Sequence, residues 1–413
     1  MSSAQVDLPP FTVLRAALGR TTEFLAHELH APRVSAPDWN GLEWNVARAV
    51  AAMQGTTVLL ANRLRWRGPP SWQAFLLAQR ELALQRDARI SLLLARIGAS
   101  MLARAVPCIA LKGAALRPLG LYRPGERPMG DIDLMTLPRD SHEVAHVMQQ
   151  LDYVQSFETR RHVVYAPRSC APAVMFGEHP DNVLKIEVHA RIAEMLPVAE
   201  VEISDGWLDR EAPPGINPYP ALAELMRHLL LHAAGNMRAH ALRQIQLHDI
   251  ALLAGRLADA DWQRLLNTPE SRGGAWWMLP PLALAGRYYP GAIAQSLLSE
   301  FTARCPAPLR QLAARMTLTG VSWSNLRIAA FPGICWSRSP REVMRFIRSR
   351  VLPSHVAVAE LKLAEAAQPA LKQVSWYGIT HAQRIQRWLF TRAPRAQTII
   401  SLRAALADLR LDS

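Results

Sequence analysis

The 413-residue chain is poor in cysteine and in long apolar runs. Its four cysteines, Cys108, Cys170, Cys305 and Cys335, are far apart, and no two of them form a C-x-x-C pair. This spacing gives no indication of a zinc knuckle or a disulfide framework, and it is typical of a reducing compartment. The longest apolar run, near 275–285, is interrupted by prolines and is too short to span a bilayer. The N-terminus lacks a basic segment followed by an apolar core, so we expect no signal peptide and a cytoplasmic location.

Lysine is scarce as well. Only four of the 47 basic residues are lysines, so nearly all of the positive charge is arginine. The formal net charge is +13, and residues 301–413 hold 17 basic against 5 acidic residues, which places most of the excess there. Such an excess is typical of a chain that binds an acidic partner, but a solvated helical face has the same composition. The length allows two or three domains with a large core.

The most informative stretch runs from Ile109 to Leu134, IALKGAALRPLGLYRPGERPMGDIDL. It predicts a strand, a glycine turn, a short helix, a basic loop and a second strand. Side chains alternate along a strand, so Asp131 and Asp133 should project from the same face. Two such carboxylates repel each other unless a cation lies between them, and hard oxygen ligands favour Mg²⁺. A glycine turn before a helix leaves N–H groups that suit a phosphate. Together these features predict nucleotidyl or phosphoryl transfer.

A third carboxylate strengthens this prediction, because an isolated D-x-D pair is more often a solvated strand end. Residues 182–189, NVLKIEVH, place Lys185, Glu187 and His189 on one face of a strand and apolar residues on the other. A polar face on an apolar strand needs a reason, since buried charge must be paired or ligated. The simplest reason is that Glu187 faces the two aspartates across a sheet. Three carboxylates can then hold two metals about 3.5–4 Å apart.

Three motifs now resemble those of a known family. They are Leu111–Leu116 (LKGAAL), Arg127–Leu134 (RPMGDIDL) and Ile186–His189 (IEVH). They are similar to the motifs of the polymerase-β-like nucleotidyltransferase superfamily, and more narrowly to those of an uncharacterised bacterial nucleotidyltransferase family with an LKG turn. The resemblance extends from about Trp39 to about Trp388, although only the central motifs are specific. It implies transfer of a nucleoside monophosphate from an NTP, which we expect to be ATP, to an acceptor.

The resemblance also implies roles for the acidic residues. Asp131 and Asp133 would bind both Mg²⁺ ions of a two-metal site. Glu187 would bind the catalytic metal and help to activate the acceptor hydroxyl or phosphate.

Four further residues are expected at the nucleotide. Lys112 and Arg127 would neutralise phosphate charge, and the turn at Gly113 would let the backbone approach it. His189, on the Glu187 face, would support a metal ligand or the nucleotide.

The expected fold is α+β, with a small mixed-sheet nucleotidyltransferase core between two helical parts. Helical apolar spacing dominates the first hundred residues, and short strands follow them with few helices between, which favours a mixed sheet over a doubly wound one. Breakers at Pro213-Pro214-Gly215 mark the second boundary. The expected parts are 1–105, an N-terminal helical segment, 106–210, the core, and 211–413, a C-terminal helical domain. Helices are predicted over 35–65, 72–105, 140–151, 221–235 and 242–253, and strands over 109–111, 131–135, 162–165 and 182–189, with 174–176 as a partner of the acidic strand.

Two pairs in the C-terminal helices carry open interpretations. His228 and His232, four apart and close to Glu224, have the spacing of metal ligands but lack an H-E-x-x-H pattern, so we expect a packed or nucleotide-facing pair instead of zinc. The family resemblance implies that Arg243 and Asp249 face the cleft. A surface ion pair explains those two residues equally well.

The acceptor is predicted to be a small molecule or a protein. Basic amphipathic helices over 341–350 and 383–392 can lie on anionic lipid, but we favour packing on their own domain over peripheral membrane contact. The aromatic residues nearby fall at helical spacing and form no stacking platform, so strong nucleic-acid binding is not expected. They are Trp336, Phe346, Trp376, Tyr377 and Trp388.

Two other functional classes remain open at this point. One is a non-catalytic protein that keeps the fold and binds nucleotide or nucleic acid. The intact trio of carboxylates argues against it. The other is a kinase-like phosphoryl transferase that uses the same metal site.

Overall fold

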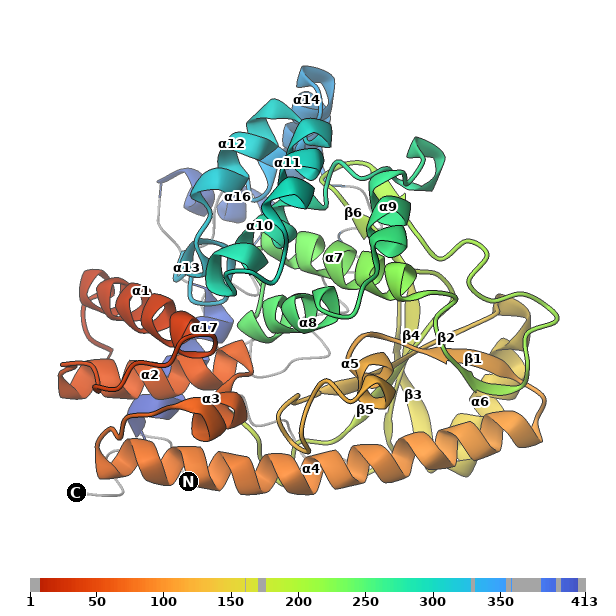
Figure 1. Cartoon of the computed structure of the whole chain (residues 1–413), viewed down its shortest axis with the longest axis horizontal. Coiled ribbons are helices and arrows are strands. Elements are labelled where there is room, and N and C mark those ends of the chain that lie inside the picture. The colour runs from red at the N-terminus through yellow and green to blue at the C-terminus, as the bar shows by residue number, and fades with distance from the viewer. Residues whose placement is uncertain are drawn as a thin grey trace.

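The N-terminal helices and the sheet are joined by one very long helix. The structure is a computed structural model that describes residues 8–159, 161–169, 176–327, 331–353, 358, 380–390 and 395–407. It begins with α1 (Phe11–Glu28), α2 (Gly41–Gln54), α3 (Thr57–Arg63) and α4 (Pro70–Ala103). Helix α4 has a proline at its first position, where no intrahelical N–H is needed. Trp72 and Phe75 near its start pack with the other helices, whereas Ile90 and Ile97 pack under the sheet. It therefore runs along the edge of both parts (Figure 1).

The central sheet is mixed, as the sequence predicts. Its six strands lie in the order β3-β4-β5-β2-β1-β8. Strand β2 runs parallel to β5, and β1 runs parallel to β8, while the remaining neighbours are antiparallel. The strands are β1 (Pro107–Ala110), β2 (Asp131–Thr136), β3 (Tyr153–Glu158), β4 (His162–Pro167), β5 (Lys185–His189) and β8 (Gly215–Asn217), with β6 (Ala193–Met195) and β7 (Glu200–Glu202) forming a separate hairpin. The short helices α5 (Lys112–Leu116), η1 (Arg117–Leu119) and η2 (Pro138–Asp140) and the helix α6 (Ser141–Gln150) connect them.

The register of β2 and β5 divides their side chains between two faces. Ile132 pairs with Ile186 and Leu134 with Val188, and all four are buried in the core formed with α4 and α6. Asp133 pairs with Glu187 on the opposite face. The alternation in the sequence therefore gives the correct faces of both strands. Strand β5 begins at Lys185, three residues later than predicted.

The rest of the chain is helical and returns to its start. It contains α7 (Leu222–Arg238), α8 (Gln244–Ala254), α9 (Asp259–Leu266), η3 (Glu270–Arg272), α10 (Leu279–Tyr288), α11 (Gln295–Arg304), α12 (Ala307–Arg315), α13 (Leu318–Val321), η4 (Ile334–Trp336), α14 (Pro340–Val351), α16 (His381–Phe390) and α17 (Ala396–Ala407). Helix α17 lies beside α2, where Arg48 donates a 2.8 Å hydrogen bond to the Ala405 carbonyl (Figure 1). One hydrophobic core thus includes residues from α1 and α2 as well as from α7 through α13 and from α17. None of the helices in the described ranges is long and apolar enough to cross a membrane.

Some predicted elements differ from the structure. The strand β3 was not predicted, and the predicted helix over 35–65 is two helices separated at Gly55, which adopts a left-handed conformation (φ 68°). Acidic strand β5 pairs with β2 and β4. Its expected partner at 174–176 lies outside the described residues except for Phe176, which stacks on Phe75. Cys170, Trp376 and Tyr377 also lie outside them.

Candidate active site

The three predicted carboxylates share one face at adjacent strands. Asp131 and Asp133 come from β2, and Glu187 lies beside Asp133 in the register with β5. Asp133 is buried, and the Glu187 side chain is 22% exposed. Glu187 points away from the apolar core, and both aspartates are near enough to raise its pKa. The structure therefore places all three predicted metal ligands on one face of the sheet, but the group of donor atoms that lie within 4.8 Å of one another there consists of His162, Glu187 and His189.

Lys112 places its ammonium group among these carboxylates. Its Nζ donates a 2.7 Å hydrogen bond to Asp133 Oδ1. Burial by itself would lower the pKa of Lys112, but Asp133, Asp131 and Glu187 outweigh it and raise this pKa. The residue adopts a left-handed backbone conformation (φ 48°), which is unfavourable for a side chain with a Cβ. The left-handed residue of the turn is thus Lys112 and not Gly113.

The three acids respond differently to this environment. Burial raises the pKa of Glu187 to about 7, with further contributions from Asp131 and Asp133. Burial and the charge of Asp133 also raise the pKa of Asp131. For Asp133, burial would raise the pKa, but Lys112 and His189 hold it well below its usual range. The Lys112 ammonium group therefore stabilises the ionised form of Asp133. It does not supply enough positive charge to keep the pKa values of Asp131 and Glu187 from rising as well. Three carboxylates of this kind fit a divalent cation with a preference for oxygen ligands.

Two histidines complete this face of the sheet. His189 Nε2 lies 3.0 Å from Asp133 Oδ1 and 3.7 Å from Glu187 Oε2. His162, on β4, pairs with His189 across the strands, and its Nε2 lies 3.8 Å from Glu187 Oε2. The sequence predicts the strand that carries His162 but assigns the residue no role. Its position becomes evident only from the β4–β5 pairing, which links residues 27 apart.

Arg127 forms an ion pair with an acidic residue of helix α8. Its Nε and Nη2 donate hydrogen bonds of 3.1 and 2.6 Å to the two oxygens of Asp249, on α8. Tyr122 donates a third, of 2.6 Å, to the same carboxylate. The guanidinium also crosses Gly113, where an added Cβ would lie 2.7 Å from Arg127 Nη1. Glycine is required here by the close approach of Arg127, a contact that the sequence does not reveal.

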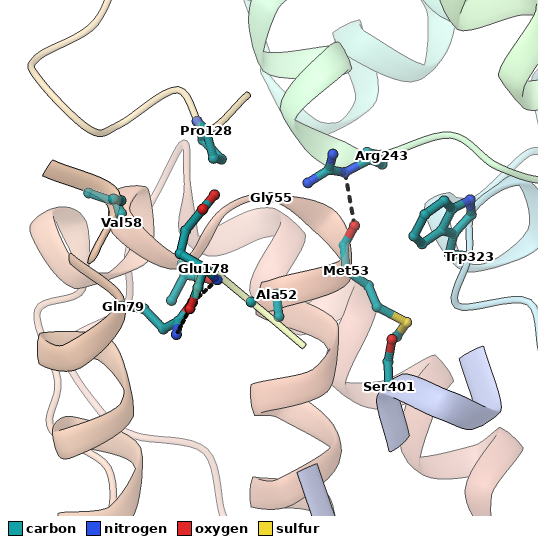
Figure 2. Close-up of a pocket in the computed structure, with 13 residues that line it drawn as sticks. Ala52, Met53, Gly55, Val58, Gln79, Pro128, Glu178, Arg243, Trp323 and Ser401 are labelled. Carbon is teal, nitrogen blue, oxygen red and sulfur yellow. Dashed lines mark hydrogen bonds between the residues drawn. The ribbon is translucent and has the colours of Figure 1, made fainter. Parts of the chain in front are cut away.

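A cavity of about 210 Å³ lies between the N-terminal helices, the loops before β2 and β5, and Arg243. Its lining comes from α2, α3, α4, the loop before β2, the loop before β5, the residue before α8, Trp323 and α17. Figure 2 shows Arg243 on one side and Glu178 with Gln79 on the other. Arg243 Nε donates a 3.0 Å hydrogen bond to the Met53 carbonyl. The charge of Arg243 also lowers the pKa of Asp131, so this arginine acts electrostatically on the acidic site.

A second cavity, of about 340 Å³, lies on the Glu187 side. Lys112, His162, Glu187 and His189 line it from the sheet and the turn, and α7 closes it from above with residues such as His228 and His232. Burial lowers the pKa of His232 to about 3, and Lys112 contributes to this shift, so the imidazole is neutral near pH 7. Of the two cavities, this is the one whose lining includes residues of the acidic site, Lys112 and Glu187.

The structure shows where the two residue pairs of the C-terminal helices lie, Arg243 with Asp249 and His228 with His232. Arg243 and Asp249 are not a surface ion pair, because Asp249 is buried against Arg127 and Arg243 lines the smaller cavity. His228 and His232 both line the larger one. His228 is additionally packed, with its Nδ1 2.6 Å from Tyr219 Oη. Tyr219 has no predicted role in the sequence.

Comparison with known proteins agrees with this geometry. Residues 40–289 match the model of a family described as uncharacterised nucleotidyltransferase. The match includes α2 through α10 and therefore both acidic strands, the Lys112 turn and the helices that close the site. No curated protein and no solved structure matches the chain significantly. The family model covers more than half of the chain, and the protein therefore belongs to the uncharacterised nucleotidyltransferase family.

Proposed function

We propose that the protein transfers a nucleoside monophosphate from ATP to a hydroxyl or phosphate of a small-molecule or protein acceptor, with release of pyrophosphate. The observation that carries this proposal is the shared face of Asp131, Asp133 and Glu187 around the Lys112 ammonium group. Three carboxylates can bind divalent metal ions, and the buried lysine beside them can bind a phosphate that the metal ions also contact.

The carboxylates would hold two Mg²⁺ ions. When bound, the ions would polarise the α-phosphate and neutralise charge on the leaving pyrophosphate. Asp131 and Asp133 have the position for ligands shared by both ions. Glu187 would bind the catalytic ion and help to activate the acceptor. Its pKa of about 7 in the metal-free site, raised by burial, Asp131 and Asp133, reflects a lack of positive charge that a bound cation would supply.

The two cavities suggest an assignment of the substrates. Arg243 and Arg127 supply positive charge on the Asp131 side, where the triphosphate would lie. Glu187 borders the larger cavity, so the acceptor would enter there, within reach of its carboxylate. The Lys112 ammonium group, among the three carboxylates, would stabilise negative charge that develops on the phosphate during transfer.

The chemical class of the acceptor can be tested directly. Purified protein is incubated with Mg²⁺, ATP labelled in the α-phosphate and an extract of soluble cell contents, and labelled products are separated into small molecules, proteins and RNA. We expect α-label in the small-molecule or protein fraction. The label of interest is the part that exceeds the label found with the extract alone, and the Asp133→Asn variant should add none to any fraction. Label confined to RNA would contradict the predicted acceptor class.

A further inference from the structure

We propose that His162, Glu187 and His189 form a binding site for a divalent transition metal, of the class of Mn²⁺, Co²⁺ or Zn²⁺, which is distinct in chemistry from the Mg²⁺ expected at the aspartates. One donor atom from each of the three residues lies within 4.8 Å of the other two. The site shares Glu187 with the proposed catalytic centre, so its role in a reaction rests on the proposed function. Metal binding itself does not, and it is measured without nucleotide.

The three donors already converge from two strands. Both imidazole Nε2 atoms approach the same oxygen, Glu187 Oε2, at 3.7 Å from His189 and 3.8 Å from His162. Ligands at about 2.1 Å from a tetrahedral metal are about 3.4 Å apart. The Glu187 contacts therefore need to contract by only a few tenths of an ångström, and His189 Nε2 must also exchange its 3.0 Å contact with Asp133 Oδ1 for the metal. Side-chain rotation on fixed strands provides such movement.

The turn before β4 fixes the position of His162. The Thr159 hydroxyl accepts hydrogen bonds from the backbone N–H groups of Arg161 and His162 at 3.1 and 3.0 Å, and it donates to the His162 carbonyl at 3.1 Å. These contacts use the proton and both lone pairs of the hydroxyl, so Thr159 positions the backbone of His162 and not its ring. The Nε2 of His162 lies on the side of Glu187, at 3.8 Å from Oε2, and it can bind a metal in the tautomer that carries its proton on Nδ1.

The ligand types decide which metal is favoured. Mg²⁺ demands oxygen ligands, whereas imidazole nitrogen suits Zn²⁺ and other first-row transition metals. Two imidazoles and one carboxylate also leave a coordination position free, and here that position faces the 340 Å³ cavity. Sites with three protein ligands and an open position are characteristic of catalysis, whereas structural zinc sites have four protein ligands.

A second histidine pair provides an internal control. His142 and His146, four apart on α6, have ring centroids 4.5 Å apart, and the His142 side chain is 81% exposed. Such a pair can bind transition metals at a protein surface without function. A valid test must therefore separate binding at His162 from binding at α6.

The test is titration of the full chain, free of any polyhistidine tag, with Co²⁺ in the absence of nucleotide. Visible d–d absorption reports nitrogen ligation, and equilibrium dialysis gives the affinity. We expect one saturable Co²⁺ site that His162→Gln weakens at least about tenfold, a loss typical of disturbed metal coordination. The His142→Gln variant should leave the site unchanged, and a large excess of Mg²⁺ should not displace the Co²⁺.

The opposite pattern would overturn the proposal. If absorption disappears in His142→Gln and persists in His162→Gln, the metal binds adventitiously at α6. If Mg²⁺ competes at equal concentration, the site is an oxygen site. Circular dichroism of each variant shows whether it is folded, and the separate variant His189→Gln should also weaken Co²⁺ binding in a folded protein. A protein that binds Co²⁺ as expected but transfers no nucleotide would contradict the proposed function and leave the metal site intact.

Discussion

Arg127 and Asp249 join the loop before β2 to helix α8 through a buried, bidentate ion pair. The Asp249 side chain, on α8, is 1% exposed. Each oxygen of Asp249 accepts a hydrogen bond from Arg127. Because the same guanidinium crosses Gly113, one contact fixes the Lys112 turn, the loop before β2 and α8 relative to one another.

Loss of Asp249 should therefore destabilise the protein strongly. We expect Asp249→Ala to lower the free energy of unfolding by about 3–5 kcal/mol, because the buried arginine loses its counterion. Urea denaturation followed by circular dichroism measures this. The matched control is Glu143→Ala, which removes the more exposed 2.8 Å pair with Arg104 and should have a much smaller effect. Equal effects of the two changes would show that the Arg127 pair contributes no more to stability than an exposed ion pair.

Because of the Arg127–Asp249 ion pair, the effect of an Arg127 variant on nucleotide affinity cannot be separated from its effect on stability. From sequence, Arg127→Ala is expected mainly to weaken NTP binding. In the structure the change also leaves Asp249 buried without a partner, so stability falls with affinity. Arg127→Lys keeps the charge and loses the bidentate geometry, and it is the better probe of the nucleotide.

The Asp133 carboxylate should be essential for turnover but not for nucleotide binding. Asp133→Asn removes the group that Lys112 and His189 both contact. We expect the rate of nucleotidyl transfer to fall at least about 10²-fold, the scale for loss of one preorganised electrostatic contact. Affinity for ATP, measured by isothermal calorimetry, should change far less. Asp181→Asn, an exposed residue in the loop before β5, is the control and should retain full activity. Comparable activity in the two variants would remove Asp133 from the catalytic site.

Acid should destabilise the protein through His248. The side chain is buried between Tyr122 and Tyr289, neither ring nitrogen has a hydrogen-bond partner among the described residues, and burial lowers its pKa to about 3, with a contribution from Arg63. The unfolded chain binds a proton near pH 6.5, whereas the folded chain does so only near pH 3. Stability is therefore full above pH 6.5 and falls toward pH 3, by up to about 1.36 kcal/mol per pH unit from this residue.

Urea unfolding at pH 7 and pH 5 tests this prediction. His248→Phe keeps an aromatic ring and cannot be protonated, so the loss of stability between these pH values should be smaller in the variant than in the wild type. His142→Phe, at an exposed position, should retain the wild-type dependence. If both variants keep it, the pH sensitivity comes from another group.

The sequence predicts the local elements of the site better than the contacts between them. Alternation along β2 and β5 is sufficient to place Asp131, Asp133 and Glu187 on polar faces, since strand periodicity is a local property. The mixed sheet and the α+β class are confirmed, and so is the resemblance to the family.

Three features of the site depend on long-range pairing and were not predicted. His162 meets Glu187 through β4–β5 pairing, Asp249 meets Arg127 from 122 residues away, and Arg127 occupies the space above Gly113. No local pattern distinguishes these residues from ordinary strand, helix and turn residues. The domain limits and the basic C-terminal part remain predictions from composition.

Binding to nucleic acid should be weak and sensitive to salt. Residues 301–413 carry an excess of 12 basic residues, and phosphate contacts made by such a segment weaken steeply as counterions are added. We expect non-specific binding of RNA or DNA that disappears near physiological ionic strength. Filter binding or fluorescence anisotropy across a salt series measures it. A saturable, submicromolar RNA complex at physiological salt would instead make RNA the leading acceptor.

The fate of the phosphates of ATP tests the central claim most directly. Parallel reactions with Mg²⁺ and an acceptor-containing extract use ATP labelled either in the α-phosphate or in the γ-phosphate. Nucleotidyl transfer predicts that α-label becomes attached to an acceptor, that γ-label leaves as pyrophosphate, and that both events vanish in Glu187→Gln. Attachment of γ-label with release of ADP would show a kinase, and ATP binding without transfer of either label would show a non-catalytic protein; either result would contradict the account.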